Sequence, residues 1–163
     1  MIKLLLLSIS LTPYWIEPSS HAGDMQLARW AFDAWQTASN GRLHFVETKI
    51  RKDAKIELVW ASPTSGLYGE VVGNTVNIRI ADEDIKDPLL RDTVVYLTCL
   101  HETGHALGLS HTANFDDIMY NFQYGGDIPE YFARYRRKLK SRDDIHKNPG
   151  LSTYDRERIA ALH

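Results

Sequence analysis

The chain has 163 residues, of which 44% are hydrophobic and 25% are charged, and these proportions are ordinary for a globular protein. This length suits a single domain with a core of its own. The formal net charge of −2 gives no overall electrostatic reason to expect nucleic acid or an anionic membrane surface as a partner.

The N-terminal segment, residues 1–12, has two interpretations. Lys3 followed by the apolar run Leu4 to Leu7 is similar to a secretory signal, and on that ground a secreted or extracytoplasmic location is slightly favoured. The alternative is a first strand or a truncated start. A single domain is expected over residues 13–163, and no other run is apolar and long enough to span a membrane.

Apolar periodicity and turn residues predict the elements that follow. Steps of three and four predict helices, alternation predicts strands, and Gly73-Asn74 predicts a hairpin turn. Asp87-Pro88 is a typical helix start, and Ser152 with Asp155 forms a capping box. The expected strands are 14–16, 43–48, 56–60, 66–72 and 75–80, and the expected helices are 24–39, 88–107, 129–140 and a short last one from 152 to near 163.

Two features before the main motif give little indication of function. The acidic trio Asp82, Glu83 and Asp84 lacks a glycine-centred loop and spaced oxygen donors, so calcium is not supported. The single cysteine, Cys99, excludes an intrachain disulfide and a cysteine-based zinc site. It is expected to be a buried small apolar residue whose side chain points away from the metal-binding side of its helix.

The strongest functional signal is His-Glu-x-x-His-x-x-Gly-x-x-His at residues 101–111. Residues four apart share a helix face, so His101 and His105 can direct two imidazoles to one point. Gly108 can end the helix in a left-handed conformation, and the returning chain can bring His111 to the same centre. Three imidazoles and one open position describe a catalytic zinc site, because a structural site would be closed by a fourth protein ligand. Glu102 is the expected general base.

This spacing resembles the metzincin zinc metallopeptidases, and the order of elements from about residue 14 onward resembles their matrixin-like branch. The resemblance implies an α+β fold of the zincin type, with a twisted mixed sheet, two long helices and a short C-terminal helix. It implies that His101, His105 and His111 bind one catalytic Zn²⁺ and that Glu102 is the general base. It further implies that Met119 forms the methionine turn below the metal and that Asp155 braces that turn.

Three departures from the matrixin pattern affect expectations about regulation. Thr112 stands where matrixins usually have serine after the third histidine. The His-x-Asp loop that holds a second, structural zinc in typical matrixins is missing before the helix at 88–107. No propeptide with a cysteine switch is recognisable, since Cys99 lies inside the expected active-site helix.

The predicted function is a zinc metalloendopeptidase in which Glu102 assists the attack of a zinc-bound water on a peptide bond. The substrate is expected to lie along an edge strand at residues 66–72, with pocket walls from residues 121–139. Expected partners are a peptide or protein substrate, without nucleic acid, and the chain is expected to be a monomer. Two alternatives remain open: a zinc-binding, proteolytically silent peptide-recognition domain, and an amidase on a small peptide-like substrate. Substrate choice cannot be read from the residues.

Overall fold

The computed structural model describes residues 11–64 and 67–162. Most of the possible leader segment lies outside the described residues, so its interpretation stays an expectation. The first strand, β1 (Leu11–Ile16), begins three residues before the expected start at Tyr14. Leu11 and Thr12 already pair with the neighbouring strand. These two residues of the possible leader therefore belong to the sheet.

Five strands form one mixed sheet, which confirms the expected α+β class with a mixed sheet. The strands lie in the order β2-β1-β3-β5-β4, and β4 is antiparallel to β5 whereas the other neighbours are parallel. The turn at Gly73, whose φ is +63°, joins β4 to β5 as predicted. β4 therefore lies at an edge and keeps one side free for another strand. The remaining bounds are β2 (His44–Glu47), β3 (Ile56–Trp60), β4 (Gly69–Val72) and β5 (Thr75–Ile78).

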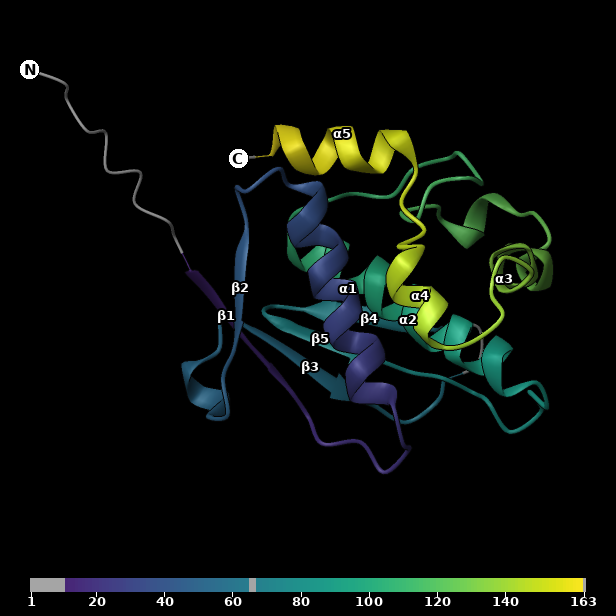
Figure 1. The fold of residues 1–163 in the computed structure, drawn as a ribbon, viewed down its shortest axis with the longest axis horizontal. Helices are drawn as coiled ribbons and strands as arrows, with labels where there is room; N and C mark the ends of the chain where they lie inside the picture. The colour runs from purple at the N-terminus through teal and green to yellow at the C-terminus, as the bar shows by residue number, and fades with distance from the viewer. Residues whose placement is uncertain (1–10, 65–66, 163) are drawn as a thin grey trace, which may run out of the picture.

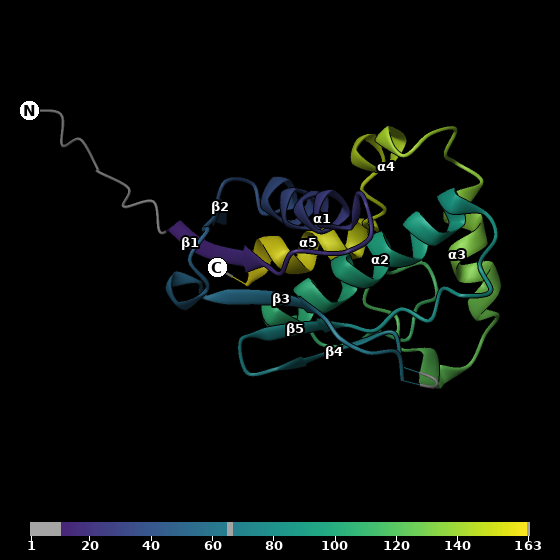
Figure 2. The same cartoon turned by 90° about the horizontal axis from the view of Figure 1, so that it is seen from below.

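The two long helices, α1 (Asp24–Ala38) and α2 (Pro88–Ala106), pack side by side on one face of the sheet (Figures 1 and 2). The apolar side of α1 is buried in the core, where Trp35 is fully buried and its indole N–H donates to the carbonyl of Leu100 at 2.9 Å. The side chain of Asp87 caps α2 by accepting from the backbone N–H of Leu89. Both long helices thus occur where periodicity and capping residues predict them, and α2 packs against β4 and β5 of the sheet.

The C-terminal third forms three further helices, α3 (Ile128–Arg136), α4 (Asp143–Lys147) and α5 (Thr153–Ala161). α3 ends four residues before the expected end at Lys140, and α4 was not predicted because five residues are too few to display a period. Short 3-10 turns, η1 (Arg51–Asp53) and η2 (Phe122–Tyr124), occupy two segments expected as loops. Among the described residues, no helix is long and apolar enough to span a membrane.

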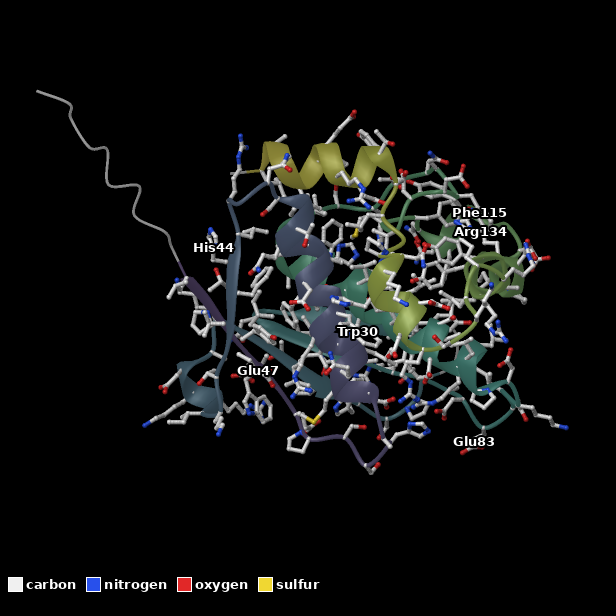
Figure 3. The ribbon with its side chains drawn as sticks, viewed as in Figure 1. Trp30, His44, Glu47, Glu83, Phe115 and Arg134 are labelled. Atoms are coloured by element: carbon white, nitrogen blue, oxygen red, sulfur yellow. The ribbon has the colours of Figure 1, made fainter. Side chains whose placement is uncertain are left out.

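Arg134 of α3 holds the loop that precedes Met119. Its guanidinium lies 4.6 Å from the ring centre of Phe115, bonds Asp116 at 2.7 Å and donates to the carbonyl of Phe115 (Figure 3). A second ring, that of Tyr131, lies 4.8 Å away on the same helix. These contacts attach Phe115 and Asp116 to α3 and so fix the chain that leads to Met119.

Candidate metal centre

Three histidines converge at the C-terminal end of α2. His101 and His105 lie one turn apart on this helix, which stops at Gly108 with φ +99°. The chain then turns back and brings His111 beside them, so that one nitrogen from each ring lies within 4.8 Å of the others. The Nε2 atoms are 3.1 Å apart for His101 and His105, 3.0 Å for His105 and His111, and 3.3 Å for His101 and His111.

Backbone carbonyls orient two of the rings. The Nδ1 atom of His101 lies 2.7 Å from the carbonyl oxygen of Ile118, and Nδ1 of His105 lies 2.7 Å from that of Leu109. A carbonyl only accepts, so each Nδ1 carries the proton and each Nε2 keeps its lone pair for the shared point. Burial lowers the pKa of all three imidazoles, that of His101 to about 3. The rings are therefore neutral near pH 7, as metal ligands must be.

The geometry of this cluster fits a zinc ion. Nitrogens in a tetrahedral shell, each about 2.0–2.1 Å from zinc, lie roughly 3.3 Å from one another, and the three Nε2 separations are close to that value. No fourth histidine, cysteine or carboxylate joins the group among the described residues. The donor set is thus compatible with an ion that keeps one position open.

Glu102 lies next to the cluster and outside it. Its side chain is buried, with 6% of the residue exposed, and burial followed by the nearby charge of Glu70 raises its pKa to about 7. Gly69 of β4 faces it directly, because a Cβ atom built on this glycine would lie 2.6 Å from Cγ of Glu102. A carboxyl group whose pKa is about 7, beside an edge strand and three imidazoles, can take up and release a proton near neutral pH.

Met119 lies against α2 below the histidines. It is fully buried, and a Cβ atom added to Gly104 would lie 2.5 Å from its sulfur and 3.0 Å from the ring of Trp35. The backbone N–H of Thr112 donates to the carbonyl of Met119 at 2.8 Å, which closes the loop between the third histidine and the methionine. This placement is compatible with the predicted methionine turn, whose role stays a prediction.

Asp155 of α5 bonds the chain beside Met119. It accepts the N–H of Ile118 at 2.8 Å and the N–H of Ser152 at 2.9 Å, within the predicted capping box. The hydroxyl of Ser152 donates to Asp117, which is also fully buried. Since the carbonyl of Ile118 in turn lies against Nδ1 of His101, α5 is linked to the histidine cluster through a single residue, Ile118. These hydrogen bonds are compatible with the brace expected at Asp155, whose role stays a prediction.

We expect Asp155→Asn to fold as stably as the wild type at pH 7, or more stably. Burial raises the pKa of Asp155 in the folded protein, so its ionisation costs stability. The protonated carboxyl group therefore stabilises the fold at pH values below the ordinary aspartate pKa. This stabilisation is lost as the pH rises through the raised pKa of Asp155 in the folded protein. The amide oxygen can still accept from Ile118 and Ser152. Thermal unfolding at several pH values should show the difference between asparagine variant and wild type shrinking towards pH 4.

The matched variant Asp155→Ala removes the oxygen that accepts both hydrogen bonds. It leaves the buried N–H of Ile118 without a partner, which costs about 1–3 kcal/mol, so it should unfold at a lower temperature than Asp155→Asn at every pH. Equal melting temperatures for the two variants would show that these hydrogen bonds do not stabilise the loop.

A cavity of about 580 Å³ opens over the histidines. One wall is the β4 side, residues 67–71, and the other combines residues 120–123 with Tyr131 and Phe132 of α3, partly as the 121–139 prediction expected. Leu97 and Thr98 line it from α2, one turn before the motif. Tyr68 and Gly69 belong to the segment 66–72 along which the substrate was expected. Leu97 and Thr98 were not anticipated as walls of the site, although residues one helical turn before His101 share its face.

Comparison with known proteins gives a consistent result. The sequence model of the Matrixin family matches residues 79–131. Rabbit (Oryctolagus cuniculus) interstitial collagenase is 28% identical over 112 residues, which cover 60% of this chain and 24% of the collagenase. The chain therefore aligns with about a quarter of the length of that relative. These two similarities support the resemblance to metzincins of the matrixin-like branch.

The fold has a solved counterpart. The crystal structure of archaemetzincin from Methanopyrus kandleri superposes with a TM-score of 0.54 at 13% identity, covering 98% of each chain. This likeness supports the zincin-like fold. Together with the Matrixin match over the histidine motif, it supports a zinc metallopeptidase-like function.

Proposed function

We propose that this chain is a zinc-dependent endopeptidase in which His101, His105 and His111 hold one catalytic zinc ion and Glu102 is the general base. The observation that carries the proposal is the convergence of three Nε2 atoms, each 3.0–3.3 Å from the others, beside a buried non-ligand carboxyl group in one cavity. A structural site would have no use for the carboxyl group or for the open position.

The bound zinc would lower the pKa of a water molecule to about 7 and polarise the substrate carbonyl. Glu102 accepts the proton that this water loses as its oxygen bonds to the carbonyl carbon. The same carboxyl group then gives the proton to the nitrogen as the C–N bond breaks, so that one water is consumed and an acid and an amine are formed. A pKa near 7 suits both transfers.

The free edge of β4 is the proposed binding surface for the substrate backbone. An extended peptide can add to such an edge through main-chain hydrogen bonds, which any sequence can form. Gly69 would place the peptide beside Glu102, since this glycine approaches the carboxylate more closely than a residue with a side chain can. The apolar cavity walls then select among side chains.

We expect Gly69→Ala to reduce peptide hydrolysis strongly. The added methyl group would lie 2.6 Å from Cγ of Glu102 and 2.9 Å from the carbonyl oxygen of Asn77, which is fixed in the sheet. Glu102 must therefore move, and a displacement of about 1 Å near the reacting atoms costs on the order of 10²-fold in rate. Val72→Ala is the matched control, because Val72 is 63% exposed on the same strand. The measurement is kcat/KM for a cleaved peptide; equal values for the two variants would contradict the placement of Gly69.

Two measurements test the proposal itself. Elemental analysis of protein purified without chelator should give about one zinc per chain, and a quenched peptide library should be cleaved. Full zinc occupancy without any cleavage would favour the silent peptide-recognition domain. A zinc content far below one per chain, even after addition of the metal, would contradict both the endopeptidase and the zinc-binding recognition domain.

A further inference from the structure

An aromatic contact joins the two walls of the cavity. The ring of Tyr68, which directly precedes β4, lies 5.7 Å from that of Phe122 in η2 and 5.3 Å from that of Phe132 in α3. All three residues line the cavity over the histidines. The cavity is therefore bridged on its α3 side.

The bridge lies very near the proposed point of cleavage. Tyr68 is the residue next to Gly69, and Gly69 faces Glu102. A strand advances about 3.3 Å per residue, so a peptide paired with β4 reaches Tyr68 within roughly one or two residues of the bond that is cut. Antiparallel pairing is the commoner and more stable arrangement. It directs the C-terminal part of the peptide towards Tyr68.

The two halves of the bridge are held differently. Phe122 packs against the rings of Tyr120, Tyr131 and Phe132, with ring centres 5.1 to 6.1 Å apart. The backbone of Tyr68 is fixed, because its carbonyl accepts the N–H of Arg79 at 2.7 Å, whereas its side chain contacts only the two rings across the cavity among the described aromatic contacts. The bridge can therefore open by rotation of the Tyr68 side chain without separation of the sheet.

We propose that Tyr68 determines which peptide bonds this site cuts. While its ring contacts Phe122, only bonds followed by a C-terminal tail of one or two residues fit, and internal bonds of longer chains are cut at a rate limited by opening of the bridge. The inference rests on the proposed hydrolysis and narrows it: bonds near a C-terminus are cut while the bridge is closed, and the endopeptidase activity on internal bonds depends on opening of the bridge. Breaking two aromatic pairs of ordinary strength corresponds to a rate difference on the order of tenfold or more.

The charged residues that line the cavity also indicate which charge the C-terminal tail of the substrate should have. None of its described lining residues is lysine or arginine, and of its two carboxyl groups that of Glu70 is already paired with Arg79 at 2.7 Å. Apart from the proposed zinc ion, a free C-terminal carboxylate would therefore lose water there without gaining a cationic side chain. The favoured tail is therefore neutral, such as an amidated end or an apolar residue followed by an amide.

The test is the distribution of cuts in a library of peptides of eight to twelve residues, amidated in one set and ending in a free acid in another, read by mass spectrometry. The wild type should cut amidated peptides mainly at the last two bonds. Tyr68→Ala should raise cleavage at internal bonds at least tenfold relative to end bonds. Tyr68→Phe keeps the ring and should behave as the wild type, as should Tyr124→Ala, whose residue is 65% exposed and does not line the cavity.

The ratio of internal to terminal cuts is measured within one protein sample, so a partly unfolded variant does not change it. Internal and terminal bonds cut equally by the wild type, or an unchanged ratio in Tyr68→Ala, would overturn the inference while leaving the proposed hydrolysis intact. Acid-ended peptides cut as fast as amidated ones would overturn the preference for a neutral tail. If neither the wild type nor Tyr68→Ala cuts any peptide when fully loaded with zinc, the hydrolysis proposal fails and this inference fails with it.

Discussion

Replacing Glu102 by alanine should reduce peptide hydrolysis by roughly 10²–10⁴-fold, the usual contribution of a positioned general base, while the zinc content stays at about one per chain. The loss is expected in kcat, because the proton transfers belong to the chemical step. Retention of zinc is expected because the carboxyl group lies outside the group formed by the three imidazoles. Kinetics on a cleaved peptide and elemental analysis of the same sample measure both effects.

Two variants control this experiment. Glu102→Gln keeps the shape of the side chain but cannot take up the proton, so it should lose as much activity as Glu102→Ala. Glu83→Ala removes an exposed carboxylate (labelled in Figure 3) that does not line the cavity, and it should retain wild-type activity. If Glu102→Gln kept activity within tenfold of the wild type, another group would have to be the base. A simultaneous loss of zinc would mean that Glu102 acts on the metal centre.

The histidine cluster could be predicted because its geometry is local in sequence. The four-residue step between His101 and His105 needs only a helix, and the return of His111 needs only a residue that accepts a positive φ, as Gly108 does. The capping box at Ser152 is local in the same sense. Such patterns bring their residues together whatever the rest of the chain does.

The parts of the site that join distant segments could not be predicted in this way. Gly69 approaches Glu102 across the boundary between β4 and α2, and nothing in the residues around it distinguishes it from a turn glycine. Tyr68 meets Phe122 only because the edge strand and η2 form opposite walls of one cavity. The buried carboxyl group of Asp117 likewise accepts a hydrogen bond from the hydroxyl group of Ser152, 35 positions away. Contacts of this kind follow from tertiary packing, which local patterns do not specify.

Replacing His111 by alanine should weaken zinc binding more than any other single change outside α2. Removal of residues that merely orient metal ligands costs about 10–100-fold in affinity, and removal of a ligand should cost more. Zinc that binds only the folded protein at 100 times its Kd stabilises that protein by about 2.7 kcal/mol. The zinc-dependent rise in melting temperature that we expect for the wild type should therefore vanish in His111→Ala at the same zinc concentration. Melting curves with zinc and with chelator measure it.

His44→Ala is the matched histidine control. His44 lies on β2 (Figure 3) and is not part of the histidine cluster, and its ring bonds only Gly41 among the described residues. It should keep the full zinc-dependent shift, whatever it does to the melting temperature in chelator. Only the difference between the melting temperatures with zinc and with chelator is compared, so the measurement separates zinc binding from the general stability of each variant. An unchanged shift in His111→Ala would place the third ligand elsewhere. In that case the centre would lack the donor that the bend at Gly108 brings to α2, and the proposed peptidase site would lose its basis.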